Sequence, residues 1–252
     1  MTLTLIGIGL SDEKDITIKG LEAVKDADVV YLETYTCLLQ VSIEKLEEFY
    51  NKKIIRAHRD LVENKVEQTI LHDAKTKKVV FLVIGDIFGA TTHVDLVTRA
   101  KQENIKVGYI HNTSILTAVG ETGLELYKFG KVTSIPFDNH HVETPYNVLK
   151  ENQKMSLHTL FLLDLKPEEN KFLTIPLAIE YLLRLEELKK QNIITEKTLF
   201  IGCARLGSKD STIKVGSAKQ LQSFNFGKAP HCIIIPSNLH FVEEEFLEQF
   251  KG

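Results

Sequence analysis

The chain has 252 residues, 43% of them hydrophobic and 26% charged, with a formal net charge of −3 at pH 7. A chain of this length forms one large domain or two modest ones, and the ordinary composition indicates a globular protein. The slightly negative charge gives no reason to expect a nucleic acid partner. No apolar stretch approaches the ~20 residues that span a bilayer, so we expect no membrane-spanning segment.

The cysteine and histidine spacing gives no sign of a metal or disulfide framework. The three cysteines, Cys37, Cys203 and Cys232, are far apart and form no C-x-x-C motif, which argues against disulfides and a cysteine zinc site. The nine histidines show no H-E-x-x-H or H-x-H spacing, so we expect no metal. The N-terminus lacks the features of a signal peptide, and we expect a cytoplasmic protein.

The first part of the chain alternates short apolar runs with amphipathic stretches. The runs predict strands at 3–8, 29–32, 54–55, 79–84 and 106–110. Helices are predicted from Ile18, from Ser42, over 61–74 and around Val94, and their candidate caps are Asp15 or Thr17, Ser42, and Thr91 or Thr92. This alternation predicts a parallel sheet with helices on both faces.

The pattern changes after residue 111. Strands are predicted at 132–137, 159–165, 199–203, 213–216 and 231–236, and helices at 116–126, 174–191 and 241–250, with a short helix after 216. The helix at 174–191 is expected to bury Leu177, Tyr181, Leu185 and Leu188 on one face. Because no flexible linker marks the change, we expect two closely joined α/β domains, 1–111 and 112–252.

The strand at 79–84 and the loop behind it are the centre of this organisation. The unbroken apolar run suits a strand covered on both faces, and it is followed by Gly85, Asp86 and Gly89 before a helix begins. In open α/β sheets, ligands bind at the carboxyl ends of the strands. An ordinary turn capped by Asp86 explains this loop equally well when the loop is taken alone.

The loop after the first predicted strand resembles part of a dinucleotide-binding motif, but a negative charge in it argues against such a ligand. Gly7 and Gly9 have the spacing of a dinucleotide fingerprint, and Glu33 lies where a ribose-binding acid is expected. The third glycine of the fingerprint is replaced by Asp12, whose carboxylate would repel a pyrophosphate at the helix N-terminus. A neutral or cationic ligand therefore fits this loop better than NAD or FAD.

Candidate ligand contacts gather at the ends of predicted strands. They are Leu10, Asp86, Gly89, Ser114, Leu163 and Leu206. His231 stands at the beginning of a strand and joins this set only if that strand runs in the opposite direction. No G-x-S-x-G surrounds Ser114, which favours a helix cap over a nucleophile. Loop backbone, leucines and one carboxylate suit an adenosine carrying a small zwitterion better than a polyphosphate.

Longer motifs connect the chain to a known family. They include Leu5-Ile-Gly-Ile-Gly-Leu, Gly85-Asp-Ile-Phe-Gly-Ala-Thr-Thr-His, His111-Asn-Thr-Ser-Ile and Leu126-Tyr-Lys-Phe-Gly-Lys. Through them the chain resembles the diphthine synthases, S-adenosylmethionine-dependent methyltransferases of the tetrapyrrole methylase type, over essentially its whole length. One departure is Ile87, where many relatives have proline, and it should alter loop stiffness more than chemistry.

The resemblance implies an N-terminal parallel sheet, a C-terminal mixed sheet, S-adenosyl-L-methionine in the cleft between the domains, and a homodimer. The positions that match the family's cofactor contacts are Leu10, Asp86, Gly89, Ser114, Ile115, Leu163, Leu206 and His231. The implied partner is elongation factor 2, in which one histidine carries a 3-amino-3-carboxypropyl group whose amine is methylated to give diphthine. The resemblance assigns no catalytic residue.

Two questions stay open at this stage. The chain is short between residues 166 and 176, as in archaeal relatives that stop at the trimethylated amine, whereas eukaryotic relatives also methylate the carboxylate. The alternatives to a protein methyltransferase are a methylase of the same fold acting on a small molecule such as a tetrapyrrole, and a non-catalytic protein-binding module.

Overall fold

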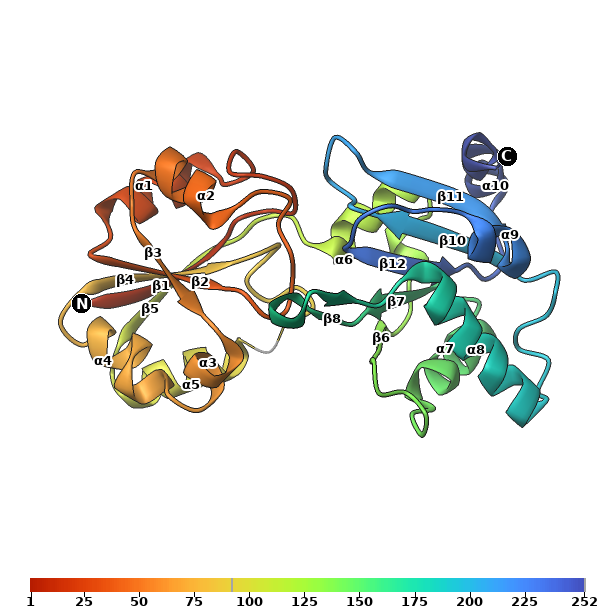
Figure 1. Ribbon diagram of the computed structural model, residues 1–252, viewed down its shortest axis with the longest axis horizontal. Helices are drawn as coiled ribbons and strands as arrows, with labels where there is room; N and C mark the ends of the chain where they lie inside the picture. The colour runs from red at the N-terminus through yellow and green to blue at the C-terminus, as the bar shows by residue number, and fades with distance from the viewer. Residues whose placement is uncertain (92, 252) are drawn as a thin grey trace. The chain divides into compact units, whose positions relative to one another are not determined.

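A computed structural model describes residues 1–91 and 93–251 of the chain (Figure 1). The chain divides into two compact units, Met1–Ala118 and Val119–Gly252. The sequence placed the division at His111, whereas in the structure Ser114 and Ile115 belong to the first unit. Each unit is an α/β body with its own sheet.

The sheet of the first unit is parallel, as the sequence predicted. Its strands are β1 (Thr2–Gly7), β2 (Val29–Glu33), β3 (Ile54–Ala57), β4 (Lys78–Val83) and β5 (Lys106–Ile110), in the order β3-β2-β4-β1-β5. β1 therefore lies between β4 and β5, and the loops that leave these three strands meet at one edge of the sheet.

Both faces of this sheet are covered, which explains the unbroken apolar run of β4. Val79, Phe81 and Val83 pack into one core with residues of α3 (Arg59–Glu63), α4 (Ile70–Ala74) and α5 (Val94–Gln102). Val80, Leu82 and Ile84 pack into another core with α1 (Ile18–Asp26) and α2 (Ile43–Tyr50). Figure 1 shows the two helix groups on opposite sides of the strands. A polar side chain on either face of β4 would be buried away from water, which costs free energy unless it finds a hydrogen-bond partner.

Two of the predicted helix caps are confirmed. The Thr17 side chain accepts a hydrogen bond from the backbone N–H of Gly20, and Ser42 accepts one from Lys45. The α5 cap was predicted wrongly at Thr91, because His93 occupies the cap position and the Thr91 hydroxyl has no partner among the described residues. Thr92 lies outside the described residues.

The single helix predicted over 61–74 is wrong. The segment forms α3, a 3-10 turn (η1, Val66–Gln68) and α4. Thr69 has φ −123° and ψ −92°, which breaks the helical path between η1 and α4. Val62, Val66 and Ile70 are all buried and are spaced four residues apart. Because this helical spacing continues across the break, the sequence does not reveal the break.

The sheet of the second unit is mixed. Its strands are β6 (Thr133–Ile135), β7 (Thr159–Leu163), β10 (Leu199–Ala204), β11 (Thr212–Ser217) and β12 (His231–Ile235), in the order β11-β10-β12-β7-β6. β6 and β7 are parallel, and the other neighbouring pairs are antiparallel. A small hairpin, β8 (Leu165–Lys166) and β9 (Lys171–Phe172), is closed by the turn η4 (Pro167–Glu169).

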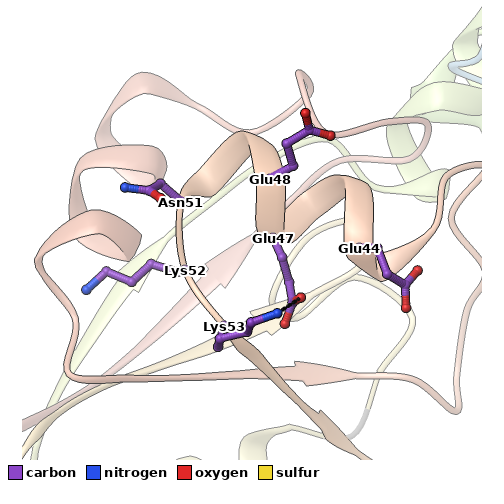
Figure 2. Close-up of a pocket in the computed structure, with 6 residues that line it drawn as sticks. All are labelled: Glu44, Glu47, Glu48, Asn51, Lys52 and Lys53. Carbon is purple, nitrogen blue, oxygen red and sulfur yellow. Dashed lines mark hydrogen bonds and ion pairs between the residues drawn. The ribbon is translucent and has the colours of Figure 1, made fainter.

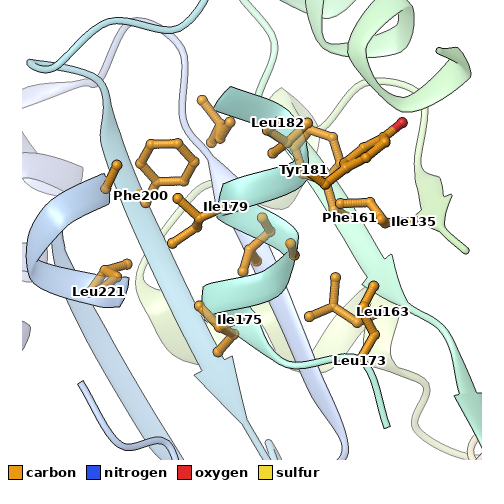
Figure 3. Close-up of a cluster of buried hydrophobic side chains, with 14 of the residues drawn as sticks. Ile135, Phe161, Leu163, Leu173, Ile175, Ile179, Tyr181, Leu182, Phe200 and Leu221 are labelled. Carbon is orange, nitrogen blue, oxygen red and sulfur yellow. The ribbon is translucent and has the colours of Figure 1, made fainter. Parts of the chain in front are cut away.

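The longest helix, α8 (Ile175–Lys189), covers one face of this sheet. Figure 3 shows Ile175, Ile179 and Leu182 of α8 in one buried cluster with Phe161 and Phe200 of the strands. The face predicted from the sequence was half right. Tyr181 and Leu185 are buried, but Leu177 and Leu188 are 49% and 72% exposed.

Other helices after β5 depart from the prediction. The helix predicted over 116–126 ends early: α6 (Ile115–Ala118) passes into η2 (Val119–Thr122), and Gly123 adopts a φ of +80°. The turn η3 (Leu126–Lys128) follows. α7 (Thr144–Lys154) was missed, because few of its residues are apolar. The chain closes with α9 (Ala218–Ser223), α10 (Phe241–Leu247) and η5 (Glu248–Phe250).

Candidate cofactor site

Glycines join the loops at the carboxyl edge of the first sheet. Gly9 and Gly85 form an isolated antiparallel bridge, in which the Gly85 N–H donates to the Gly9 carbonyl at 2.7 Å. Both have φ in the left-handed region, +79° and +85°. A Cβ on Gly7 would lie 2.6 Å from the Gly85 carbonyl oxygen and 2.9 Å from Asn112 Cβ. Gly7 thus lets the β4 and β5 loops meet over the end of β1.

Asp15 fixes the loop that carries Leu10. Its Oδ2 accepts hydrogen bonds from the backbone N–H of Leu10 at 3.1 Å and of Ser11 at 2.7 Å. The carboxylate of Asp15 therefore binds loop backbone, while Thr17 caps α1. The sequence offered Asp15 only as a helix cap, and its function in this loop was missed.

Asp86, directly beyond β4, is held by three donors of its own chain. Its Oδ1 accepts from the Phe88 N–H at 3.1 Å, and its Oδ2 accepts from the Asn112 N–H at 3.0 Å and lies 2.9 Å from His111 Nδ1. Partial burial acts to raise the pKa of Asp86, but the hydrogen bonds from Asn112, Phe88 and His111 outweigh it and lower the pKa. The carboxylate is ionised at neutral pH.

Gly89 and Ser114 lie in direct contact. A Cβ on Gly89 would stand 2.5 Å from Ser114 Cβ and 2.7 Å from its Oγ, so only glycine fits here without a shift. The Ser114 hydroxyl accepts from the Leu116 N–H at 3.1 Å, and its carbonyl accepts from Thr117 and Ala118. Ser114 is the predicted cap of α6, and the half-buried Ile115 begins that helix.

Asn112 connects these loops, and sequence reasoning missed it. Its Nδ2 donates to the Gly7 carbonyl at 3.0 Å and to the Asp15 carbonyl at 2.9 Å, while its backbone N–H donates to Asp86. The signal available in the sequence was its position inside the His111-Asn-Thr-Ser-Ile motif. The structure thus brings together Leu10, Asp86, Gly89, Ser114 and Ile115 and adds Asp15, His111 and Asn112 to them.

The remaining predicted contacts share one edge of the second sheet. Leu163 ends β7, and Leu206 follows β10. β12 runs antiparallel to both strands, with His231 opposite Ala204 and Cys232 opposite Leu162. The strand direction required for His231 to join the set is therefore confirmed.

His231 presents an unsatisfied nitrogen at this edge. Its Nε2 lies 3.0 Å from the Lys228 carbonyl, so Nε2 carries the hydrogen and donates it. Its Nδ1 is buried and has no hydrogen-bond partner among the described residues. Burial lowers the pKa of His231, and the imidazole is neutral at pH 7. A buried acceptor without a donor is costly, and a ligand N–H group would satisfy it.

Arg205 stabilises the loop that carries Leu206. Its backbone has a φ of +52°, and its buried guanidinium donates to the carbonyls of Phe226, Lys228 and Asp210. An ion pair with the Asp210 carboxylate at 3.0 Å adds to this network. Arg205 thereby ties the turn after β10 to the segment that precedes β12.

One depression on the surface lies away from the predicted contacts. A shallow depression along α2 is lined by Glu44, Glu47, Glu48, Asn51, Lys52 and Lys53, and Lys53 pairs with Glu47 at 2.8 Å (Figure 2). It includes none of the predicted contacts. Cys37, Cys203 and Cys232 are free thiols. Within 1–91 and 93–251, no group of His, Cys, Asp or Glu side chains is placed to hold a metal ion. Across the same residues, no helix has the length and apolarity to cross a membrane.

Comparison with known proteins identifies the family. Residues 2–222 match the family Tetrapyrrole (Corrin/Porphyrin) Methylases. The chain is 46% identical to the diphthine synthase of Methanocaldococcus jannaschii, covering 98% of this chain and 97% of that protein. The chain belongs to the diphthine synthase family. A crystal structure of a diphthine synthase superposes with a TM-score of 0.90 at 39% identity, covering 100% of this chain and 96% of the other.

Family membership confirms the resemblance and the fold class and makes the chain a methyltransferase, which requires a methyl donor. Family membership does not distinguish between diphthine and its methyl ester as the product. The chain is also 43% identical to the diphthine methyl ester synthase of Dictyostelium discoideum, over 100% of this chain and 98% of that protein. The two relatives differ in the product they are named for, yet their identities to this chain are nearly equal.

Proposed function

We propose that the chain transfers methyl groups from S-adenosyl-L-methionine to elongation factor 2. The acceptor is the amine of the 3-amino-3-carboxypropyl group on one histidine of that protein. The observation that carries the proposal is the edge formed by the loops after β1, β4 and β5, in a chain of a methyltransferase family. Glycine backbone and leucine line this edge, and the ionised carboxylate of Asp86 suits a positively charged donor.

The residues present fit such a donor. Leu10, Gly89, Ser114 and Ile115 offer backbone and small or aliphatic side chains to an adenosine, and Asp86 offers negative charge to a cationic group. In the second unit, the bare Nδ1 of His231 would accept a hydrogen bond from a ligand amine. Leu163 and Leu206 remain predicted contacts, and the cleft expected between the domains remains a prediction.

The chain contributes position and environment to the reaction. When bound, S-adenosylmethionine supplies a methyl group on a positively charged sulfur, open to attack by a neutral amine. Holding the amine in line with that methyl group is worth ~7–11 kcal/mol. The hydrogen bonds of Asp15, Asp86 and Asn112 hold the loops in one arrangement before the donor arrives, so little ordering remains to be done on binding.

We also infer a homodimer in the cytoplasm whose product is the trimethylated amine. The support for this product is the short connection between β7 and α8, which consists of little more than the β8–β9 hairpin. The family resemblance supports the dimer, and the unpaired cysteines support a reducing compartment.

Mass spectrometry of the reaction product tests this proposal. Elongation factor 2 bearing the unmethylated side chain is incubated with the protein and with S-adenosylmethionine labelled in its methyl group by deuterium. We expect three labelled methyl groups, all stable to mild alkali, on the modified histidine. A fourth that alkali removes would identify the methyl ester as product, and the absence of any label would reject the proposed function.

A further inference from the structure

The imidazole of His111 lies against the carboxylate of Asp86 at the edge of the first sheet. His111 Nδ1 is 2.9 Å from Asp86 Oδ2. Because the Asp86 carboxylate is ionised, it can only accept, and Nδ1 must carry the hydrogen that it donates. In the neutral imidazole, the second ring nitrogen, Nε2, then has a free lone pair. Within residues 1–91 and 93–251 no donor contacts it.

In the Asp86–His111 pair, the carboxylate is held in place and the imidazole is accessible. Asp86 is anchored by the backbone N–H groups of Phe88 and Asn112, which set the position of its carboxylate. The Phe88 ring lies 6.2 Å from the His111 ring, centroid to centroid. The His111 side chain is nevertheless 65% exposed, whereas that of Asp86 is 15% exposed. A carboxylate that holds an accessible imidazole in one tautomer is the arrangement by which enzymes orient a histidine base.

Methyl transfer to an amine needs such a base. At neutral pH an aliphatic amine is largely protonated and has no lone pair with which to attack. Of the histidines that the structure describes near strand ends, His93, His158 and His231 are buried, with exposures of 2%, 0% and 8%. His58, directly after β3, is exposed, but β3 is an edge strand and is separated from β4 and β1 by β2. The three buried histidines offer little surface to the side chain of a protein substrate, and the partner proposed above for His231 Nδ1 is the small donor. His111 is accessible and lies in the same loop cluster as the predicted donor contacts Asp86 and Ser114.

We propose that His111, oriented by Asp86, is the catalytic residue that takes the proton from the substrate amine before each methyl transfer. This inference rests on the proposed function. His111 Nε2 accepts a proton from the ammonium, and the positive charge that forms on the imidazole is stabilised by Asp86. The freed nitrogen lone pair forms the new N–C bond, and the C–S bond breaks with its electrons remaining on sulfur as a thioether. The imidazolium then returns its proton to water, ready for the next transfer.

Two substitutions at this position separate proton transfer from loop structure. His111→Ala leaves space for a free imidazole molecule, whereas His111→Gln fills much of that space and provides no base. Single-turnover transfer to elongation factor 2 is measured at saturating S-adenosylmethionine with and without added imidazole. Donor affinity by calorimetry and thermal unfolding are measured for both variants. His72→Gln, an exposed histidine of α4, is the matched control.

We expect both His111 variants to bind the donor and unfold as the wild type does, because the side chain is largely exposed. Transfer should slow by about 10²–10⁴-fold, the usual contribution of a general base, and His72→Gln should transfer normally. Imidazole should accelerate His111→Ala by roughly tenfold or more and leave His111→Gln unchanged. Transfer by His111→Ala within about threefold of wild type would overturn the inference. So would a slow variant that imidazole does not rescue, or a loss of donor affinity as large as the loss of rate. Failure of the wild type to label elongation factor 2 would instead reject the proposed function, and this inference with it.

Discussion

Replacing Gly89 by alanine tests whether the contact between the β4 loop and α6 shapes the donor site. The new Cβ would stand 2.5 Å from Ser114 Cβ and 2.7 Å from Ser114 Oγ, distances that real Cβ atoms do not show. Gly89 does not have a positive φ, so alanine adds no backbone strain and the effect is purely steric. Either the loop or the first turn of α6 must move, and both carry predicted donor contacts.

The size of the effect follows from the cost of overpacking. Forcing an extra methyl group into a filled site costs about 1–3 kcal/mol, which corresponds to a roughly 5- to 150-fold weaker affinity if the strain is relieved only in the free protein. Both clashing atoms belong to the Ser114 side chain. Ser114→Gly removes them, and exchange of a serine cap for glycine costs only a few tenths of a kcal/mol. The double variant Gly89→Ala/Ser114→Gly should therefore recover most of the lost affinity.

Calorimetric titration with S-adenosylhomocysteine measures all four proteins of this cycle. We expect the two substitutions to couple by about 1 kcal/mol or more in the direction of rescue. Gly120→Ala is the matched control, because its Cβ would lie 3.7 Å from the nearest atom of Leu126, an ordinary contact. Additive effects of the two substitutions, or an unchanged affinity in Gly89→Ala, would refute the steric argument.

Three further predictions concern two side chains of the first unit, Asp86 and Asn112, and one of α10, Glu243. Asp86→Ala should weaken donor binding about tenfold or more while the fold survives, and an unchanged affinity by calorimetry would remove Asp86 from the site. Asn112→Ala loses the bonds to the Gly7 and Asp15 carbonyls. It should lower the free energy of unfolding in urea by about 1–3 kcal/mol, and a value near zero would contradict the connecting function. Burial alone would raise the pKa of Glu243. Hydrogen bonds from Lys128 and from backbone N–H groups outweigh burial and hold this pKa at about 2. Its side chain is 1% exposed, so it contributes about 3 kcal/mol that is present above its ordinary pKa of 4.5 and is lost as pH falls toward 2. Glu243→Gln should flatten the acid dependence of stability over that range, and an unchanged slope would contradict this assignment.

The parts of the fold that the sequence predicted well are those fixed by local signals. The run at 79–84 has no polar interruption, and only a strand buried on both faces accommodates it. Thr17 and Ser42 stand directly before apolar periodic stretches, and they cap the helices that follow. In the 61–74 segment the periodicity was real, but the backbone breaks at Thr69, and burial every four residues does not reveal such a break.

In the candidate site, too, the residues marked by local signals could be predicted, and the contacts that depend on the arrangement of strands could not. Asp86 and Gly89 could be found from the sequence because they follow a strand directly. The contact between Asp86 and His111 could not, because it depends on β1 lying between β4 and β5 and on Gly7 being small enough for the two loops to meet above it. The place of His231 likewise depended on the direction of β12, which its own residues do not specify.

The account's central claim is that the loops after β1, β4 and β5 hold the methyl donor. A crystal structure of the protein with S-adenosylhomocysteine tests it most directly. We predict that the ligand lies against Leu10, Gly89 and Ser114, with the Asp86–His111 pair intact and His111 Nε2 open toward the reacting sulfur. Ligand density at any other place on the chain, or these loops closed over by the protein's own side chains, would contradict the account.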